Sequence, residues 1–227
     1  MASLRDTAAC IGITGDFSVV GDFFGYLAPP QSAPKAGAYP DLSVLTQISR
    51  LQGRYVDMNL IRVGIESFTP GDETEIDGAV QFTRDNYAQI SLGVGRVLRF
   101  FITTAEANGH ANIGSNGEAR DLTNEWTVDN DALDVFFVLT YATDTIGRSD
   151  VNGCNKDGPG IDGSVVAIER SDNTTGFVLA HEAGHYLGLR HRGDPGNLMF
   201  RDVPNGGNLT STQGADMRDH CFTNDAC

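Results

Sequence analysis

The segment from Val178 to Phe200 reads VLAHEAGHYLGLRHRGDPGNLMF and holds three of the five histidines in the 227-residue chain. His181 and His185 stand four positions apart, so on a helix they share one face. Gly188 accepts the positive φ that ends a helix in a sharp turn, and such a turn brings His191 back toward the other two. Three convergent imidazoles can hold a zinc ion and leave its fourth position to water.

Glu182 follows the first of these histidines directly and is not needed as a ligand. From that position its carboxylate can take a proton from a water that the metal activates and later deliver it to the leaving amine. A bare HExxH occurs by chance in many helices. The longer pattern HExxHxxGxxH adds a glycine and a third histidine at fixed places, so a zinc site is the better interpretation.

The stretch HEAGHYLGLRH, followed by NLM, resembles the metzincin zinc proteases with their Met-turn. The short link DPGNLM is most similar to the matrixin branch, whereas IDGSVVAIERS and LTSTQGADMRDHC are similar to pappalysin-like bacterial metzincins. The resemblance covers residues 161–221. Arg192 stands where matrixins carry serine, so the matrixin-like and pappalysin-like branches both remain open.

The resemblance implies a role for each matching residue. His181, His185 and His191 would be the zinc ligands, and Glu182 would be the general base. Met199 would form the hydrophobic floor beneath the metal, although a plain core methionine is the alternative.

The resemblance also implies a metzincin-like zincin fold of the α/β (α+β) class. A twisted mixed sheet and two long helices would lie above the cleft, and a small irregular C-terminal subdomain with one helix below it. We expect an irregular N-terminal segment packed on the domain at 1–50, an upper catalytic subdomain at 51–188, and a lower subdomain with the Met-turn at 189–227.

Hydrophobic periodicity outside the motif is compatible with this order of elements. A helical face recurs between Ile76 and Ile90, with a capping box expected from Asp72 and Glu75. A short helix is expected within 41–52, and Thr210 with Gln213 predicts the last helix. Residues 104–132 are polar and glycine-rich and predict a long loop or a small subdomain. Strands are expected at 55–65, 96–103, 133–141 and 164–169, with an edge strand for substrate pairing within 142–163.

Two arginines are candidates for the substrate pocket. Arg192 and Arg201 flank the expected wall of the pocket for the side chain just after the cleaved bond. They would favour acidic side chains there, or else both point to solvent.

Charge and composition limit the partners of the chain. Sixteen basic against thirty acidic residues give a net charge of −14, which disfavours binding to nucleic acid or to an anionic membrane. No apolar run is long enough to cross a bilayer, and no leader peptide is visible at the start. We expect a secreted, extracellular monomer that acts on a protein or peptide substrate.

The cysteines and one acidic loop suggest further stabilisation. Cys10, Cys154, Cys221 and Cys227 match no zinc-finger spacing and predict two disulfides, with three pairings open. An oxygen-rich loop predicts either a calcium site or a hydrated acidic loop. Its candidate ligands are Asp150, Asn152, Asp157 and Asp162.

The predicted function is a zinc-dependent endopeptidase that hydrolyses peptide bonds of proteins. A gluzincin needs a downstream glutamate as its third ligand, and no glutamate follows Glu182. A non-catalytic binding module stabilised by zinc and a zinc hydrolase of a non-peptide amide remain as alternatives.

Overall fold

The structure is a computed structural model of the whole chain, and it describes most of the sequence after position 52. The helix expected within 41–52 and the packing predicted for 1–50 fall outside the described residues, except for one short strand. No helix in the described part of the chain is long and apolar enough to cross a membrane. The described residues are 37–39, 53–142, 145–151, 154–156, 158–168, 174–202 and 206–225.

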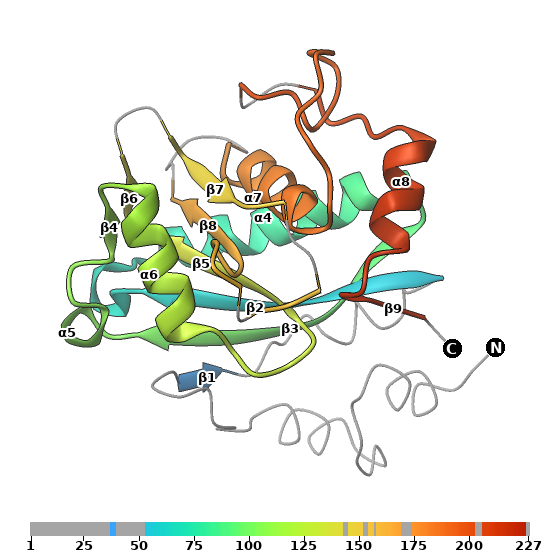
Figure 1. Cartoon of the computed structure of the whole chain (residues 1–227). Helices are drawn as coiled ribbons and strands as arrows, with labels where there is room; N and C mark the ends of the chain where they lie inside the picture. Colours follow the sequence, from blue (N-terminus) through green and yellow to red (C-terminus); the bar gives the residue numbers. More distant parts are fainter. Residues whose placement is uncertain are drawn as a thin grey trace, which may run out of the picture.

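A mixed sheet forms the centre of the described part, with its strands in the order β1-β3-β2-β5-β8-β7 and with β9 also paired to β2 (Figure 1). The four inner strands run parallel, whereas β1, β7 and β9 pair antiparallel with their neighbours. Four expected strands are therefore present, as β2, β3, β5 and β8, and β7 is the expected edge strand. The bounds are β1 (Gly37–Tyr39), β2 (Arg54–Val63), β3 (Leu92–Ile102), β5 (Leu133–Val138), β7 (Gly147–Ser149), β8 (Ser164–Ala167) and β9 (Thr223–Asp225).

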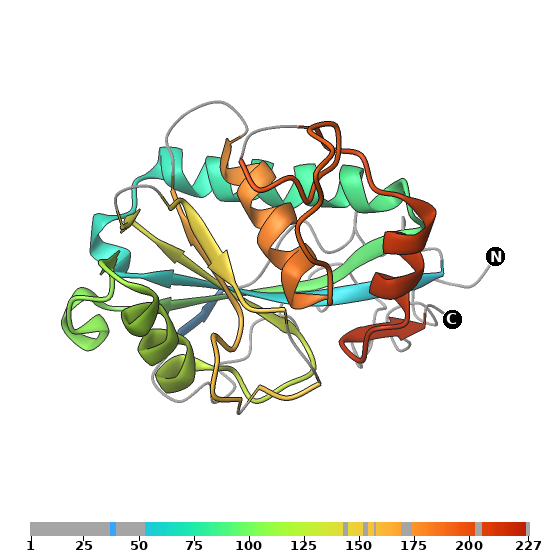
Figure 2. The same ribbon diagram turned by 45° about the horizontal axis from the view of Figure 1, so that its top comes forward.

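Helices cover both faces of this sheet (Figure 2). α4 (Pro70–Ala88) and α7 (Thr174–Tyr186) lie on one face, and α6 (Asn116–Trp126) lies on the other. The alternation along β2 divides its side chains between two cores, because successive side chains point to opposite faces. Met58 and Leu60 enter the core under α4 and α7, and Ile61 enters the core under α6.

Residues 104–132 form a small subdomain, which is the second of the two expected alternatives. It contains α5 (Thr104–Ala107), β4 (Asn112–Ile113) and α6. β4 pairs in parallel with β6 (Thr140–Tyr141), and η1 (Ile65–Ser67) lies beside α5. The polar composition hid this unit because α6 turns only a narrow buried face, which includes Trp126, toward the sheet.

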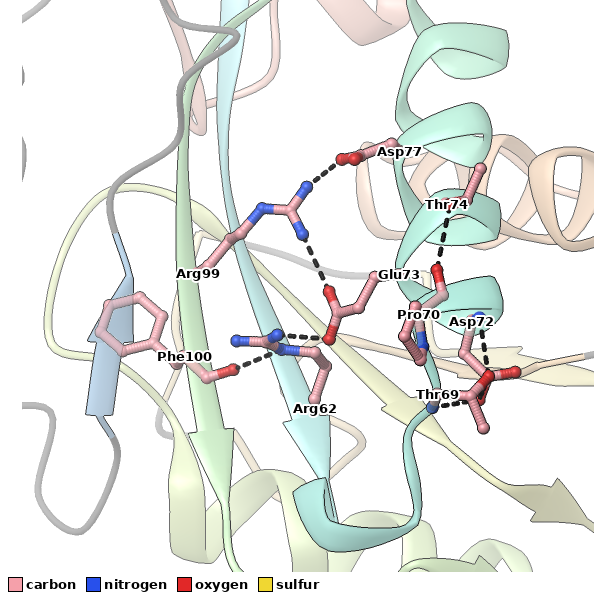
Figure 3. Close-up of polar contacts among 9 residues, drawn as sticks. All are labelled: Arg62, Thr69, Pro70, Asp72, Glu73, Thr74, Asp77, Arg99 and Phe100. Atoms are coloured by element: carbon pink, nitrogen blue, oxygen red, sulfur yellow. Dashed lines mark hydrogen bonds and ion pairs between the residues drawn. The ribbon is translucent and has the colours of Figure 1, made fainter.

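The capping box predicted from Asp72 and Glu75 is wrong. α4 begins at Pro70, and Thr69 is its N-cap (Figure 3). The Thr69 hydroxyl accepts from the Asp72 N–H, and the Asp72 carboxylate accepts from the Thr69 N–H at 2.7 Å. Proline at the first helical position needs no hydrogen-bond partner for its nitrogen, which favours a start at this place.

Arginines on two strands hold α4 against the sheet. Glu73 pairs with Arg62 of β2 and with Arg99 of β3, and Arg99 also reaches Asp77 one turn along the helix (Figure 3). The Arg62 side chain is only 6% exposed, so its charge requires this partner. Farther along α4, the Tyr87 hydroxyl donates to the Ala180 carbonyl at 2.8 Å, which ties α4 to α7.

A disulfide links the C-terminal part to the loop after β7, and an ion pair links that loop to the sheet. Cys154 is bonded to Cys221, which follows α8 (Ser211–Arg218), while Cys10 and Cys227 lie outside the described residues. Near this disulfide, Lys156 Nζ lies 3.2 Å from the fully buried Asp134 carboxylate of β5. The capping box predicted at the start of α8 is confirmed, because Thr210 accepts from the Gln213 N–H.

Loss of this disulfide is expected to lower stability measurably. It joins positions 67 residues apart, so the double variant Cys154→Ser, Cys221→Ser should lose about 2–5 kcal/mol of unfolding free energy. Urea denaturation of both proteins without reductant measures this difference. An unchanged midpoint with an unchanged slope would show that the crosslink contributes nothing.

Candidate metal centre

α7 carries His181, Glu182 and His185 into the interior of the protein. These three residues are polar, yet they are only 2%, 7% and 7% exposed, respectively. The helix packs on α4, β5, β7 and β8, so it is surrounded on most sides. This packing fixes which way the three side chains point. Thr174 is the first described residue of this helix.

A glycine turn ends α7 directly after the second histidine. Gly188 has φ of +93°, its N–H donates to the His185 carbonyl, and the Leu189 N–H donates to the Gly184 carbonyl. These two bonds define a Schellman motif, in which the residue with positive φ is usually glycine. The turn predicted from the sequence is present, and it reverses the chain toward His191.

The three histidines meet at one point. Nε2 of His191 lies 3.2 Å from Nε2 of His181 and 3.1 Å from Nε2 of His185. Tetrahedral zinc with Zn–N bonds of about 2.0–2.1 Å holds its nitrogens about 3.3–3.4 Å apart, so the spacing fits this metal. Among the residues that the structure describes, this is the one group of three or more ligand side chains close enough to share an ion.

Backbone carbonyls fix the orientation of two of the rings. Nδ1 of His181 donates to the Leu198 carbonyl at 2.7 Å, and Nδ1 of His185 donates to the Leu189 carbonyl at 2.8 Å. Because a carbonyl only accepts, Nδ1 carries the proton and Nε2 presents its lone pair. Lone pairs that face each other repel unless a cation lies among them, and such outer contacts are typical of metal ligands.

Burial keeps the histidines neutral, which is the form that binds metal. It lowers the pKa of His185 to about 4, and it lowers the pKa of His181 below its usual value. The pKa of the more exposed His191 is also lowered, by partial burial and then by Arg201. A neutral imidazole offers a lone pair at neutral pH, so no proton competes with the metal there.

Glu182 lies beside the triad in a low-polarity environment. Burial raises the pKa of Glu182 to about 8, while the Arg148 charge and a hydrogen bond from the Ser149 backbone oppose this rise. A carboxylate with a raised pKa is a better proton acceptor near neutral pH. The residue therefore has the basicity that proton abstraction needs.

Two glycines allow neighbouring segments to approach α7 closely. A Cβ on Gly147 of β7 would lie 2.9 Å from Cγ of Glu182, and a Cβ on Gly184 would lie 2.8 Å from Sδ of Met199. Neither glycine was predicted to have this role. The signal for Gly184 was its place between Glu182 and the second histidine, on the side of the helix that meets the Met-turn.

A buried pair of side-chain amides, which was not predicted from the sequence, holds the Met-turn in place. Met199 is fully buried, and its N–H donates to the side chain of Asn197. Asn197 exchanges two hydrogen bonds with Gln213 of α8, at 2.8 and 3.0 Å. No local pattern links the two amides. The predicted position of Met199 as a floor beneath the metal remains a prediction.

A cleft of about 530 Å³ opens beside the triad. Its lining includes Glu182, Tyr141 of β6, the residues of β7, and Arg201 with Asp202. Arg201 is thus placed in the cleft, with a side chain that is 77% exposed and 3.6 Å from Asp202. Arg192 is exposed and is not part of this lining, so only one of the two candidate pocket arginines is brought to the cleft.

The candidate calcium ligands are not gathered into a site by the described residues. The Asp150 carboxylate accepts from the Ile161 N–H and lies 3.6 Å from Arg148. Asp162 is buried at 3% exposure, and Asn152 and Asp157 fall outside the described residues. Calcium therefore has no support here and remains a prediction.

Comparisons with known proteins place these features in a family. A family model described as Matrixin, of the peptidase M10 family, matches residues 60–217. A metalloproteinase-II from Bacteroides fragilis is similar in structure, with a TM-score of 0.50 and 16% identity over 74% of this chain, which spans about half (52%) of that protein. An archaemetzincin from Methanopyrus kandleri has a TM-score of 0.49 and 14% identity, over 72% of this chain and 93% of its own. A comparison with curated proteins found no match.

Taken with the sheet order, the family match and the likeness to the Bacteroides fragilis metalloproteinase confirm the expected metzincin-like zincin fold of the α/β class. Of the two branches that the sequence left open, the family match favours the matrixin branch.

Removal of one histidine should abolish zinc binding. His185→Ala leaves two nitrogens, and two ligands do not hold zinc tightly. We expect a fall of at least about 100-fold in zinc affinity, measured by competition with a chelating dye. The control His110→Ala removes a histidine outside the triad and should bind zinc as the wild type does. Equal affinity in both variants would contradict the site.

Two glycine-to-alanine variants separate helix propensity from packing. Gly184→Ala places a methyl group against the buried sulfur of Met199 and should destabilise the protein by about 1–3 kcal/mol. Gly78→Ala on α4 meets nothing within 4 Å and should stabilise it by up to about 1 kcal/mol. Urea unfolding of the zinc-loaded proteins measures both. Stabilisation by both substitutions would contradict the packing argument, because it would show that the Met199 side chain moves aside without an energetic cost.

Proposed function

This chain belongs to the matrixin family of metallopeptidases, and on that premise we propose that it is a zinc-dependent endopeptidase that hydrolyses internal peptide bonds of proteins. The observation that carries the proposal is the meeting of three imidazole Nε2 atoms beside a buried glutamate. The residues in these roles are His181, His185 and His191 as ligands and Glu182 as general base.

The proposed chemistry divides between the metal and the protein. Bound zinc supplies a Lewis acid that polarises the scissile carbonyl and activates a water. Glu182 accepts a proton from the attacking water as the oxygen forms its bond to the carbonyl carbon. It then gives this proton to the departing amine nitrogen when the C–N bond breaks, so the residue ends in its starting form. A hydrogen bond from the Ser149 backbone lowers the pKa of Glu182 and so favours the ionised form, which is the form that accepts the proton.

The outer edge of β7 is the proposed binding site for the substrate peptide. β7 is the last strand of its sheet among the described residues. Ile146 bonds with Ala167 of the β8 segment, so by antiparallel alternation the backbone groups of Gly147 and Ser149 face outward. A substrate strand that pairs antiparallel with this edge would cross the triad. The cleft would then separate the part at 51–188 from the part at 189–227.

Arg201 is proposed to flank the substrate on the C-terminal side of the cleaved bond. Its high exposure and its contact with Asp202 favour a side chain directed to solvent over one that selects acidic residues.

Two other functions remain as alternatives. A zinc-stabilised binding module would have no use for a base buried beside the metal site, and the raised pKa of Glu182 favours catalysis. A hydrolase of a non-peptide amide would use the same groups. The open edge of β7 beside the triad favours a peptide, because an extended backbone pairs with it.

We further propose that the protein acts outside the cell as a monomer. The Cys154–Cys221 disulfide is typical of proteins that fold in an oxidising compartment. The net charge of −14 argues against partners such as nucleic acid or anionic membranes.

The substitution Glu182→Gln tests the proposal. The amide keeps the shape of the side chain but accepts no proton, so cleavage of casein or a quenched peptide should fall by about 100- to 10,000-fold. Zinc content, measured by elemental analysis, should remain that of the wild type. A chelator should stop the wild type, and added zinc should restore it. Zinc-loaded wild type that cleaves no protein or peptide would refute the endopeptidase.

A further inference from the structure

A second hollow adjoins the cleft and shares Arg148, Ser149, His185 and His191 with it. It has a volume of about 670 Å³ and is lined by β7 and the residues after it, by the turn after α7, and by His185 and His191. We call it the arginine hollow, and we define it by Arg148, Ser149, Asp150, Val151 and Arg190. The proposed reaction uses the backbone of Ser149, but it uses none of these side chains.

The direction of β7 sets which part of a peptide would reach this hollow. β7 runs from Gly147 to Ser149, and the hollow lies at its later end, near Val151. A peptide paired antiparallel runs the opposite way, so its N-terminal half passes the later end of β7. The arginine hollow therefore receives the side chains that precede the cleaved bond, and the cleft with Arg201 receives those that follow it.

The hollow carries more positive than negative charge. Arg148 lies 3.6 Å from Asp150, whose carboxylate also accepts from the backbone, so this cation is partly compensated. Arg190 is exposed and has no ion pair or side-chain hydrogen bond to any residue in the described ranges. Val151, at 39% exposure, adds the one exposed large apolar side chain of the described residues. An apolar surface beside a free guanidinium suits a side chain with a methylene stem and a carboxylate end.

We propose that the arginine hollow binds an acidic side chain on the N-terminal side of the cleaved bond, with Arg190 as the main determinant. This inference rests on the endopeptidase proposed above and names its substrate class, which is peptides that carry glutamate within about three residues before the cut.

The net charge of −14 opposes an acidic peptide, but only weakly at this place. Charges farther away than about 8 Å are largely screened at physiological ionic strength, whereas contacts inside the hollow are not. Within the hollow, the two arginines face a single aspartate. The local charge therefore outweighs the charge of the whole molecule.

Cleavage of matched peptides provides the first test. Quenched peptides are built on a sequence that the wild type cuts, and they carry Glu, Gln or Lys at each of the three positions before the bond. At one position kcat/KM should be roughly tenfold higher with Glu than with Gln, and lowest with Lys. The Glu-to-Gln ratio should fall toward one in Arg190→Gln.

Arg192→Gln is the matched control. It removes the same charge from a residue two positions away that lines neither the cleft nor the arginine hollow. It should keep the wild-type ratio. A ratio near one at all three positions in the wild type would overturn the inference, as would an equal ratio in Arg190→Gln.

Binding to an inactive protein separates this inference from the proposed function. Zinc-loaded Glu182→Gln should bind a fluorescent Glu peptide roughly tenfold more tightly than its Gln counterpart, and the added Arg190→Gln should remove the difference. Selective binding without any cleavage by the wild type would refute the endopeptidase but retain the binding of glutamate in the arginine hollow. Cleavage without charge preference would do the reverse, and the absence of both would refute both.

Discussion

The reversal of the chain at Gly188 is the constraint on which the metal centre depends. A helix continued through His191 would place it about 9 Å along the axis from His185, too far to share an ion. The positive φ of +93° is the backbone state that glycine adopts without strain. The same turn points the Leu189 carbonyl at Nδ1 of His185. Reversal of the chain and orientation of a ligand ring are therefore one geometric event, and a substitution at Gly188 disturbs both.

Close packing on two sides of α7 explains how the buried polar side chains keep their positions. β7 approaches at Gly147 and the Met-turn approaches at Gly184, each so closely that an added methyl group meets a side chain at 2.9 Å or less. Side chains with so little free space around them have few rotamers available. The groups that would bind metal and move protons are thus placed before any substrate arrives, which reduces the entropy lost on reaching the transition state.

Sequence patterns predicted those features whose physical cause is local. The helical face of α4, the triad spacing and the capping box at Thr210 all involve residues within one or two turns of each other. The amide pair of Asn197 and Gln213 and the pairing of β4 with β6 join residues 16 or more positions apart, where no periodic signal exists. The cap of α4 was misplaced because several acidic residues in the first turn offered competing capping boxes. Thr69 before Pro70 was the better signal, since proline fixes the first helical residue.

The strand β7 combines three tasks that would otherwise need separate elements. Its outward backbone groups are available to a peptide, its Arg148 borders both the cleft and the arginine hollow, and the backbone of its Ser149 opposes the rise in the pKa of Glu182. In the proposed complex, the strand would keep the base and the substrate backbone in a fixed relation, because the same three residues of β7 contact both. A shift of β7 would then misplace the base and the scissile bond together, so under this proposal the edge of the sheet, rather than α7 alone, sets the geometry of the reaction.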